Sequence, residues 1–208
     1  MDFALIAISA ANVIFSFMGF ENMELMRRFD FHIGSIRAGD QIRMFSSGFL
    51  HADIAHLAVN MLTLFCFAPI VSLFAGTFTF LLVYVGSLLF GNLLTLLLHK
   101  NEYHYRAIGA SGAVTGVVYS AILFAPDMLV YGVIPGYIFG MVYLFFSIYG
   151  MKAKRDNIGH TAHFGGAVGG YVITLCQSPY MFTDNLLTVI ILAIPILILF
   201  YMAKTGKI

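Results

Sequence analysis

Charge is scarce in this 208-residue sequence: 10% of its residues are charged and 60% are apolar, whereas an ordinary soluble domain is about 25% charged. Neither sign is in excess, since 11 Lys and Arg stand against 10 Asp and Glu. A basic surface for nucleic acid and an acidic disordered tail are therefore both excluded. Cys66 and Cys176, the two cysteines, fall in separate apolar stretches and predict no disulfide framework. Both lie in lipid-buried positions of predicted helices, and we expect them to be packing residues.

The uncharged stretches have the length of membrane spans. A helix rises about 1.5 Å per residue, so about 20 residues cross a hydrocarbon core of about 30 Å. The stretch 54–99 is long enough for two crossings and offers a turn at Gly76. The charge map predicts seven helices, over 3–20, 53–74, 77–98, 108–125, 128–149, 159–177 and 184–203.

An all-α membrane protein follows from this pattern, because backbone amides in lipid must be satisfied within each segment and no alternating barrel pattern is present. We expect a single membrane domain over 1–208. The first helix lacks a basic region before its apolar run, which predicts that it is retained and is not a cleaved signal. The segment 21–50 mixes apolar residues with Arg and acids, which favours a loop in the membrane interface over a solvated loop.

Six polar side chains stand where lipid should have excluded them, near the starts of the second, fourth and sixth predicted helices. Because the loops alternate sides, these three starts lie on one membrane face. Polar residues inside membrane helices are functional candidates, although each alone is as readily explained by helix cross-linking. The six are His51, His56, Asn60, Ser111, His160 and His163.

A hydroxyl and an imidazole among them suggest acyl transfer chemistry. Small faces at Gly112xxxGly116, Gly165xxxGly169 and Gly166xxxGly170 allow the fourth and sixth helices to approach closely. These motifs can also serve packing alone. If the two helices meet, Ser111 and His163 begin the contact together as nucleophile and general base. Neither helix holds an acidic residue, so the sequence favours a dyad over a triad.

The pattern resembles the rhomboid family of intramembrane serine proteases. The matching elements are Arg43 eight residues before His51, the run HADIAHLAVN from His51 to Asn60, Gly-Ala-Ser-Gly at 109–112, and AHFGGAVGG at 162–170. They occur in the family's order at the family's helix positions. The resemblance covers about residues 1–177, and the helix at 184–203 looks like the additional C-terminal helix of some rhomboids, a six-plus-one arrangement.

The resemblance implies a role for each of these positions. Ser111 would be the nucleophile, His163 the base that later protonates the leaving amine, and His56 and Asn60 the lining of the oxyanion hole. The supporting positions would be Gly109, Gly112, His51, His160 and Arg43. The loop 150–159 would cap the site, the helix at 128–149 would gate substrate entry, and the substrates would be transmembrane segments of other proteins. No metal or organic cofactor is implied.

Two positions depart from the family's pattern. Thr115 stands four residues after the nucleophile, where the family often has an aromatic residue packed on the catalytic imidazole. Ile42 replaces a Trp that is common beside the loop Arg. The first departure bears on the orientation of His163.

Charge and resemblance give opposite membrane orientations. All 11 Lys and Arg lie in segments on the face of the six polar residues, and the positive-inside rule would place that face in the cytoplasm. The resemblance places the site on the extracytoplasmic side, and we keep this orientation as the prediction, with a bacterial cytoplasmic membrane as the location. The oligomeric state and the physiological substrate are not indicated.

Two other functions fit part of the pattern. His51, His56, His160 and His163 are residues of a type that binds zinc, although no HExxH motif or intramembrane carboxylate pair is present to act as the base of a metal hydrolase. A catalytically silent relative that only binds transmembrane helices is the other alternative. The joint match of the motifs favours the protease.

Overall fold

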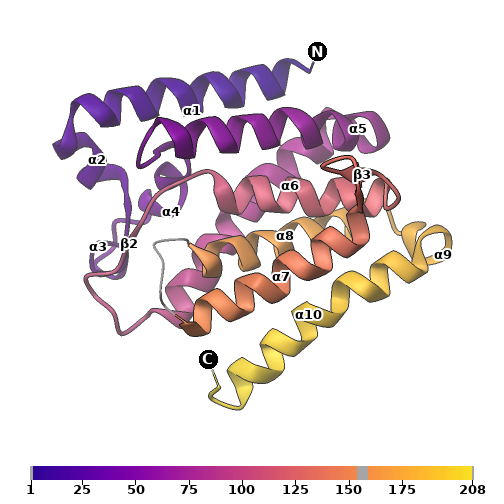
Figure 1. Ribbon diagram of the computed structural model, residues 1–208. Coiled ribbons are helices and arrows are strands. Elements are labelled where there is room, and N and C mark those ends of the chain that lie inside the picture. The colour runs from indigo at the N-terminus through magenta and orange to yellow at the C-terminus, as the bar shows by residue number, and fades with distance from the viewer. Residues whose placement is uncertain (1, 154–158, 208) are drawn as a thin grey trace.

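The computed structural model describes residues 2–153 and 159–207, and this part of the chain is nearly all helical. The long helices lie alongside one another in a bundle, and α10 packs on the outer side of α7 (Figure 1). The helices are α1 (Phe3–Glu21), α2 (Met23–Phe29), α3 (Ile33–Arg37), α4 (Arg43–Ser46), the 3-10 turn η1 (Ser47–Phe49), α5 (Ile54–Leu98), α6 (Ser111–Phe124), α7 (Gly136–Ala153), α8 (His160–Gln177), α9 (Met181–Asp184) and α10 (Leu186–Lys204). The strands are β1 (Phe31–His32), β2 (Arg106–Ala107), β3 (Leu129–Val130) and β4 (Ile134–Pro135).

The chain bends within α5 at the predicted turn. Gly76 has φ 81° and ψ 162°, a conformation that breaks the helix and that residues with a Cβ rarely adopt. The carboxylate of Asp2 accepts hydrogen bonds from the hydroxyls of Ser72 at 2.6 Å and Thr77 at 2.9 Å, one on each side of the bend. The two halves of α5 therefore correspond to the second and third predicted helices.

Within the described residues, three helices are long and apolar enough to cross a membrane by length and composition, namely α1, α5 and α10. The central helix α6 has only 14 residues and is buried from Gly112 to Phe124, so it is enclosed by other helices. A helix is present in each predicted range, and these helices together form an all-α bundle.

Two short antiparallel strand pairs, β1–β2 and β3–β4, interrupt the helical pattern. The sequence predicted neither pair. The pair β3–β4 joins Leu129 to Pro135 and Val130 to Ile134. The reversal between them uses positive φ values at Tyr131 (54°) and Gly132 (75°), which end any helix there. The helix predicted over 128–149 therefore begins at Gly136. A second pair, β1–β2, ties the segment after α1 to the segment before α6.

Part of segment 21–50 lies inside the protein, contrary to the prediction that its apolar residues rest in the membrane interface. Phe31, Ile33 and Ile36 are buried and form a small core with partly buried neighbours that include Leu96 and Tyr105. Met23, in contrast, is 61% exposed. The β1–β2 pairing brings this segment onto the bundle and supplies a protein partner for its apolar face.

Cys66 and Cys176 are free thiols and both are exposed. Each lies on the outward face of its helix, the face that lipid would surround in a membrane. Their apolar thiols need no polar partner on such a face.

The centre of the bundle is built from glycine contacts among α5, α6 and α8. A Cβ added to Gly166 would overlap the carbonyl oxygen of Gly112, and one added to Gly170 would overlap that of Gly116. On its other side, α8 meets α5, where a Cβ on Gly165 would lie 2.8 Å from the Cα of Gly91. The absence of these side chains lets α6 and α8 touch backbone to backbone.

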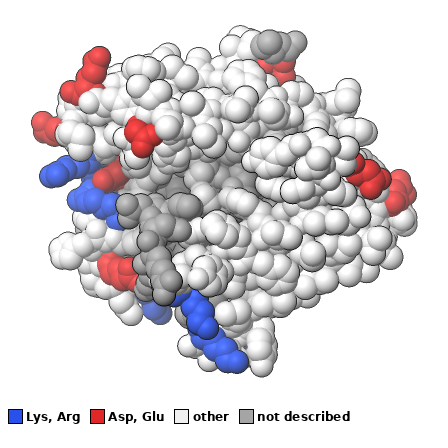
Figure 2. Space-filling view, viewed as in Figure 1, with Lys and Arg blue, Asp and Glu red and all other residues white. Residues whose placement is uncertain are grey.

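Basic side chains gather at one end of the bundle. In Figure 2 the Lys and Arg atoms lie over the end that carries α2, α3, β2 and the C-terminus, whereas Asp and Glu side chains appear both at that end and at the opposite end, near β3 and α9. The described bases lie in the segments that follow α1 and α5, in the last turns of α7 and α10, and at Lys207 after α10. The described Lys and Arg residues thus share one end of the bundle, the end on which the charge map placed them.

Candidate active site

Ser111 is the first residue of α6, and a shaped turn places it there. Gly109 has φ 131°, which turns the chain sharply before the helix. Its amide donates to the Ser47 carbonyl at 3.0 Å, and the Ala110 amide donates to Nε2 of His51 at 3.4 Å. These contacts fix the turn from the side of η1. The amide of Ser111 points out of the helix start, where the helix itself supplies no acceptor.

His163 meets Ser111 across the contact of α6 and α8. Nε2 of His163 lies 2.7 Å from Oγ of Ser111, a hydrogen-bond distance. The approach depends on Gly112, whose added Cβ would lie 3.1 Å from the carbonyl oxygen of Ala162, the neighbour of His163. The structure thus brings together two residues that are 52 positions apart in the chain.

Tyr143, from α7, completes the environment of the imidazole. Its hydroxyl lies 3.0 Å from Nδ1 of His163. The two rings are also stacked, with centroids 6.2 Å apart and an interplanar angle of 25°. Sequence reasoning missed Tyr143. The signal available was a hydroxyl within an apolar helix, but its partner depends on how α7 packs against α8.

Thr115 does not contact the imidazole in the way that an aromatic residue would. Its hydroxyl donates to the carbonyl of Ser111 at 2.7 Å and lies 3.4 Å from the hydroxyl of Tyr143. The small side chain leaves room for the Tyr143 ring beside His163. Thr115, where the family often has an aromatic residue, and the Tyr143 ring from α7 thus fill the space beside His163 together.

His56 lies against the turn that carries the serine. A Cβ added to Gly109 would lie 2.7 Å from Cε1 of His56 and 3.6 Å from Oγ of Ser111, so all three residues converge. Asn60 lies one turn further along α5, is 5% exposed, and donates its amide to the carbonyl of His56 at 3.1 Å. The structure brings His56 to the serine, while the observed hydrogen bond of Asn60 is to its own helix.

His51 is fully buried and supports the turn from behind. Its Nδ1 lies 2.8 Å from the hydroxyl of Ser16 in α1. Burial, followed by the neighbouring His56, lowers the pKa of His51 to about 4, while Asp53 opposes the shift. His51 is therefore neutral at pH 7 and has a lone pair on Nε2 for the Ala110 amide.

His160 contacts α7 and does not point at the serine. It is 4% exposed, and its ring meets Phe146 edge to face at 5.3 Å between centroids. A Cβ on Gly150 would overlap this ring, so the glycine makes room for it. His160 joins α8 to the C-terminal end of α7, and its ring also meets that of His163 edge to face at 6.3 Å between centroids.

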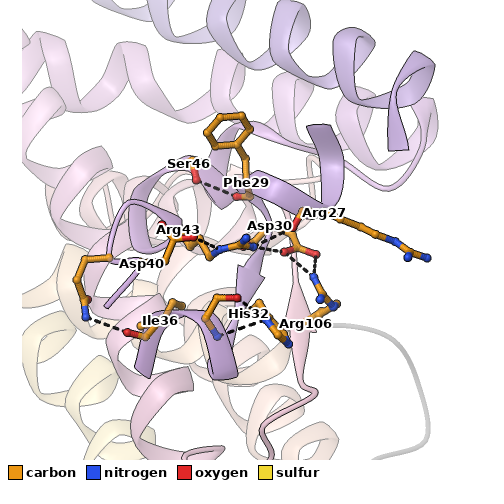
Figure 3. Close-up of polar contacts among 11 residues, drawn as sticks. Arg27, Phe29, Asp30, His32, Ile36, Asp40, Arg43, Ser46 and Arg106 are labelled. Carbon is orange, nitrogen blue, oxygen red and sulfur yellow. Dashed lines mark hydrogen bonds and ion pairs between the residues drawn. The ribbon is translucent and has the colours of Figure 1, made fainter. Parts of the chain in front are cut away.

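Arg43 organises the segment before the site, and Figure 3 shows its contacts. The guanidinium donates to the carboxylates of Asp30 at 2.8 Å and Asp40 at 2.6 Å, and to the carbonyl of Arg27 at 2.9 Å. Asp30 also accepts from Arg106 at 2.7 Å. Since Arg106 lies in β2 and is paired with β1, this cluster holds segment 27–43 to the strand that leads to Ser111.

Residues 154–158 lie outside the described part of the chain, so the predicted cap at 150–159 is not described as a whole. The predicted gate, α7, is present and supplies Tyr143. For the metal alternative, the described residues contain no group of three or more His, Cys, Asp or Glu placed to hold a metal ion. Both ring nitrogens of His51 and of His163 already lie at hydrogen-bond distance from protein groups.

Comparisons with known proteins agree on one family. The profile of the Rhomboid domain matches residues 38–180. A protein of Bacillus subtilis (strain 168) named "Putative rhomboid protease YdcA" is 33% identical over 141 residues, which make up 66% of this chain and 68% of that protein. "RHOMBOID-like protein 12, mitochondrial" of Arabidopsis thaliana is 24% identical over 181 residues, which make up 78% of this chain and 54% of that protein.

Proposed function

The chain belongs to the rhomboid family, and we propose that it is an intramembrane serine endopeptidase that cleaves transmembrane segments of other membrane proteins. Family membership and the apolar helices make it an integral membrane protein. The observation that carries the proposal is the 2.7 Å distance between Oγ of Ser111 and Nε2 of His163. A hydroxyl held against an unprotonated imidazole nitrogen is an activated nucleophile.

The reaction would proceed in two stages at this pair. Oγ of Ser111 attacks the scissile carbonyl while Nε2 of His163 accepts the hydroxyl proton, and the imidazolium then gives that proton to the leaving amine. Water next attacks the acyl-enzyme with His163 again as base, which releases the new carboxyl terminus and restores Ser111. Two residues therefore handle every proton transfer.

The developing oxyanion needs donors, and we assign that role to three groups. The amide of Ser111 lies at the start of α6, where the helix dipole also favours negative charge. The His56 ring lies beside Gly109 and Ser111. Asn60 can reach the site if its amide exchanges the His56 carbonyl for the substrate oxygen. One such donor contributes about 10²–10³-fold to the rate.

The proposed substrate and location follow from the assignment as an intramembrane protease. A substrate helix would enter beside α7, unwind, and present one peptide bond to Ser111. The enzyme needs no metal or organic cofactor for this chemistry. We place it in a bacterial cytoplasmic membrane, as one membrane domain over 1–208 with α10 as the additional helix.

The direct test uses protein purified in detergent and a reporter protein with one transmembrane segment. We expect the unmutated chain to cleave it and Ser111→Ala and His163→Ala each to lose at least about 10³-fold in rate, because each removes half of the dyad. His104→Ala, at an exposed histidine, serves as the control and should cleave normally.

Two outcomes would contradict the proposal. Undiminished cleavage by Ser111→Ala would exclude the serine mechanism and return attention to the histidines. Binding of the reporter without cleavage by the unmutated chain, unchanged in Ser111→Ala, would identify a helix-binding relative.

A further inference from the structure

We propose that Tyr143 is a positioning residue for His163: it holds the imidazole in the tautomer and orientation that a base for Ser111 requires. The inference rests on the proposed function, since it assigns Tyr143 a part in the same dyad. It starts from the contact of the Tyr143 hydroxyl with Nδ1 of His163 at 3.0 Å, on the opposite edge of the ring from Ser111.

A neutral imidazole has one N–H and one lone pair, so it acts as base at Nε2 only when the proton is on Nδ1. Ser111 alone does not select this form, because its hydroxyl donates to a bare Nε2 or accepts from a protonated one. The Tyr143 hydroxyl, as an acceptor for Nδ1–H, favours the form whose Nε2 is free to take the serine proton.

The hydroxyl of Tyr143 has a further partner that directs its own proton. Thr115 donates its hydroxyl proton to the Ser111 carbonyl at 2.7 Å, which leaves the Thr115 oxygen as an acceptor. The Tyr143 hydroxyl lies 3.4 Å from that oxygen. With its proton turned to Thr115, Tyr143 presents a lone pair to His163. The bonds therefore run in one direction, from Nδ1–H through Tyr143 and Thr115 to the backbone of the nucleophile.

The ring of Tyr143 adds a second constraint, on orientation. Its stacking on the imidazole, with an interplanar angle of 25°, limits rotation of His163 about its side-chain bonds.

Neighbouring contacts hold α7 where Tyr143 reaches His163. One turn before Tyr143, the hydroxyl of Tyr119 in α6 donates to the carbonyl of Gly140. Gly140 also fits against Leu192 of α10, where an added Cβ would lie 2.9 Å from Cδ2. The dyad is thus made by α6 and α8, but its orientation is supplied by α7 and is complete only while α7 stays in this position.

The test compares Tyr143→Phe, which keeps the ring and removes the hydroxyl, with Tyr143→Leu, which removes both. The matched control is Tyr149→Phe, at a 63% exposed tyrosine of the same helix. Readouts are kcat and KM on the reporter substrate and the rate at which a fluorophosphonate labels Ser111. We expect Tyr143→Phe to lose about 10-fold in kcat and in labelling, as for one hydrogen bond to a charged group.

The same variant should leave KM within about 2-fold, and Tyr143→Leu should lose about 5-fold more from the missing ring contact. The control should match the unmutated chain. If Tyr143 had only a structural role, its substitution would instead lower thermal stability or the active fraction, without a selective loss of kcat and of labelling rate. Normal kcat and labelling in Tyr143→Phe would overturn the inference.

A spectroscopic readout separates failure of this inference from failure of the proposed function. In protein labelled with nitrogen-15 histidine, with His163 assigned by its absence in His163→Gln, the spectrum distinguishes the protonated from the bare ring nitrogen. We expect the proton on Nδ1 in the unmutated chain and a shift of population toward Nε2 in Tyr143→Phe. If the two tautomers had the same populations in Tyr143→Phe as in the unmutated chain, the inference would be overturned, even in an active enzyme. The expected shift would support the inference even in a chain that cleaves nothing.

Discussion

At the scale of single residues, the partners of each histidine decide its chemistry. His51 is neutral because burial lowers its pKa to about 4, and it accepts the Ala110 amide. His160 is enclosed by α7 and packs on Phe146. His163 faces Ser111 with one nitrogen and Tyr143 with the other. Three residues of one type therefore have three distinct roles, and sequence spacing alone did not distinguish them.

The ion pairs around Asp30 also differ by environment. The side chains of Asp30 and Arg43 are 7% and 10% exposed, whereas that of Arg106 is 44% exposed. Asp30→Asn leaves the buried Arg43 with a weaker partner, so we expect about 3 kcal/mol less free energy of unfolding. Arg106→Gln should cost no more than about 1 kcal/mol, as for an exposed pair.

Unfolding in mixed detergent and sodium dodecyl sulfate measures both values. Equal losses in the two variants would show that burial does not govern this cluster. Because β1–β2 leads to Ser111, Asp30→Asn should also slow cleavage at temperatures where the protein remains folded.

At the scale of elements, backbone contact between α6 and α8 sets the distance between the nucleophile and the base. Gly112 and Gly116 on α6 face Gly166 and Gly170 on α8. Each of these contacts excludes a Cβ, so the two helix axes lie closer than side chains would allow. The glycine motifs that packing alone would explain are here the reason that Ser111 reaches His163.

The backbone contact between α6 and α8 predicts that one added methyl group lowers both stability and activity. In Gly166→Ala the new Cβ would overlap the Gly112 carbonyl, which is backbone and cannot rotate away. We expect about 1–3 kcal/mol of lost stability and, from displaced reacting groups, up to about 10²-fold slower cleavage.

Gly86→Ala is the control, because its Cβ would meet only the flexible end of Ile173. It should retain near-normal stability and activity. Thermal denaturation and reporter cleavage are measured on both variants. A fully active Gly166→Ala would show that the helices can separate without disturbing the dyad.

At the scale of the whole molecule, charge and family membership disagree about orientation. The bases of the described loops lie at the end with α2, α3 and the C-terminus (Figure 2), which is also the end of Ser111. Several are engaged within the fold: Arg43 and Arg106 bind Asp30, and Arg37 donates to the carbonyl of Lys100 at 2.6 Å. The bases near the site therefore also hold its loops together.

We predict the orientation that the rhomboid resemblance implies, with this end outside the cytoplasm. A reporter active only outside the cytoplasm, fused after residue 208, should then be active, since α10 ends on the side of the site. The matched fusion carries a reporter active only in the cytoplasm and should be silent. The reverse result would show that the positive-inside rule governs this chain.

The class of the protein was predictable from the sequence alone. Scarce charge and long apolar runs led to an all-α bundle, and the motifs around Ser111 and His163 led to the rhomboid family, which the profile match confirms. These features were predictable because hydropathy and the motifs are patterns of residues that lie near one another in the chain. The turn at Gly76 was predictable for the same reason.

The start of α7, the exposure of the cysteines and the partner of Tyr143 became clear only from the three-dimensional structure, because they depend on contacts between distant segments. The late start of α7 at Gly136 depends on the β3–β4 pairing, and the exposure of Cys66 and Cys176 depends on which way each helix faces. The pairing of Tyr143 with His163 needs α7 to lie beside α8 at one register. A sequence indicates which side chains are unusual in a membrane helix, but packing determines which of them meet.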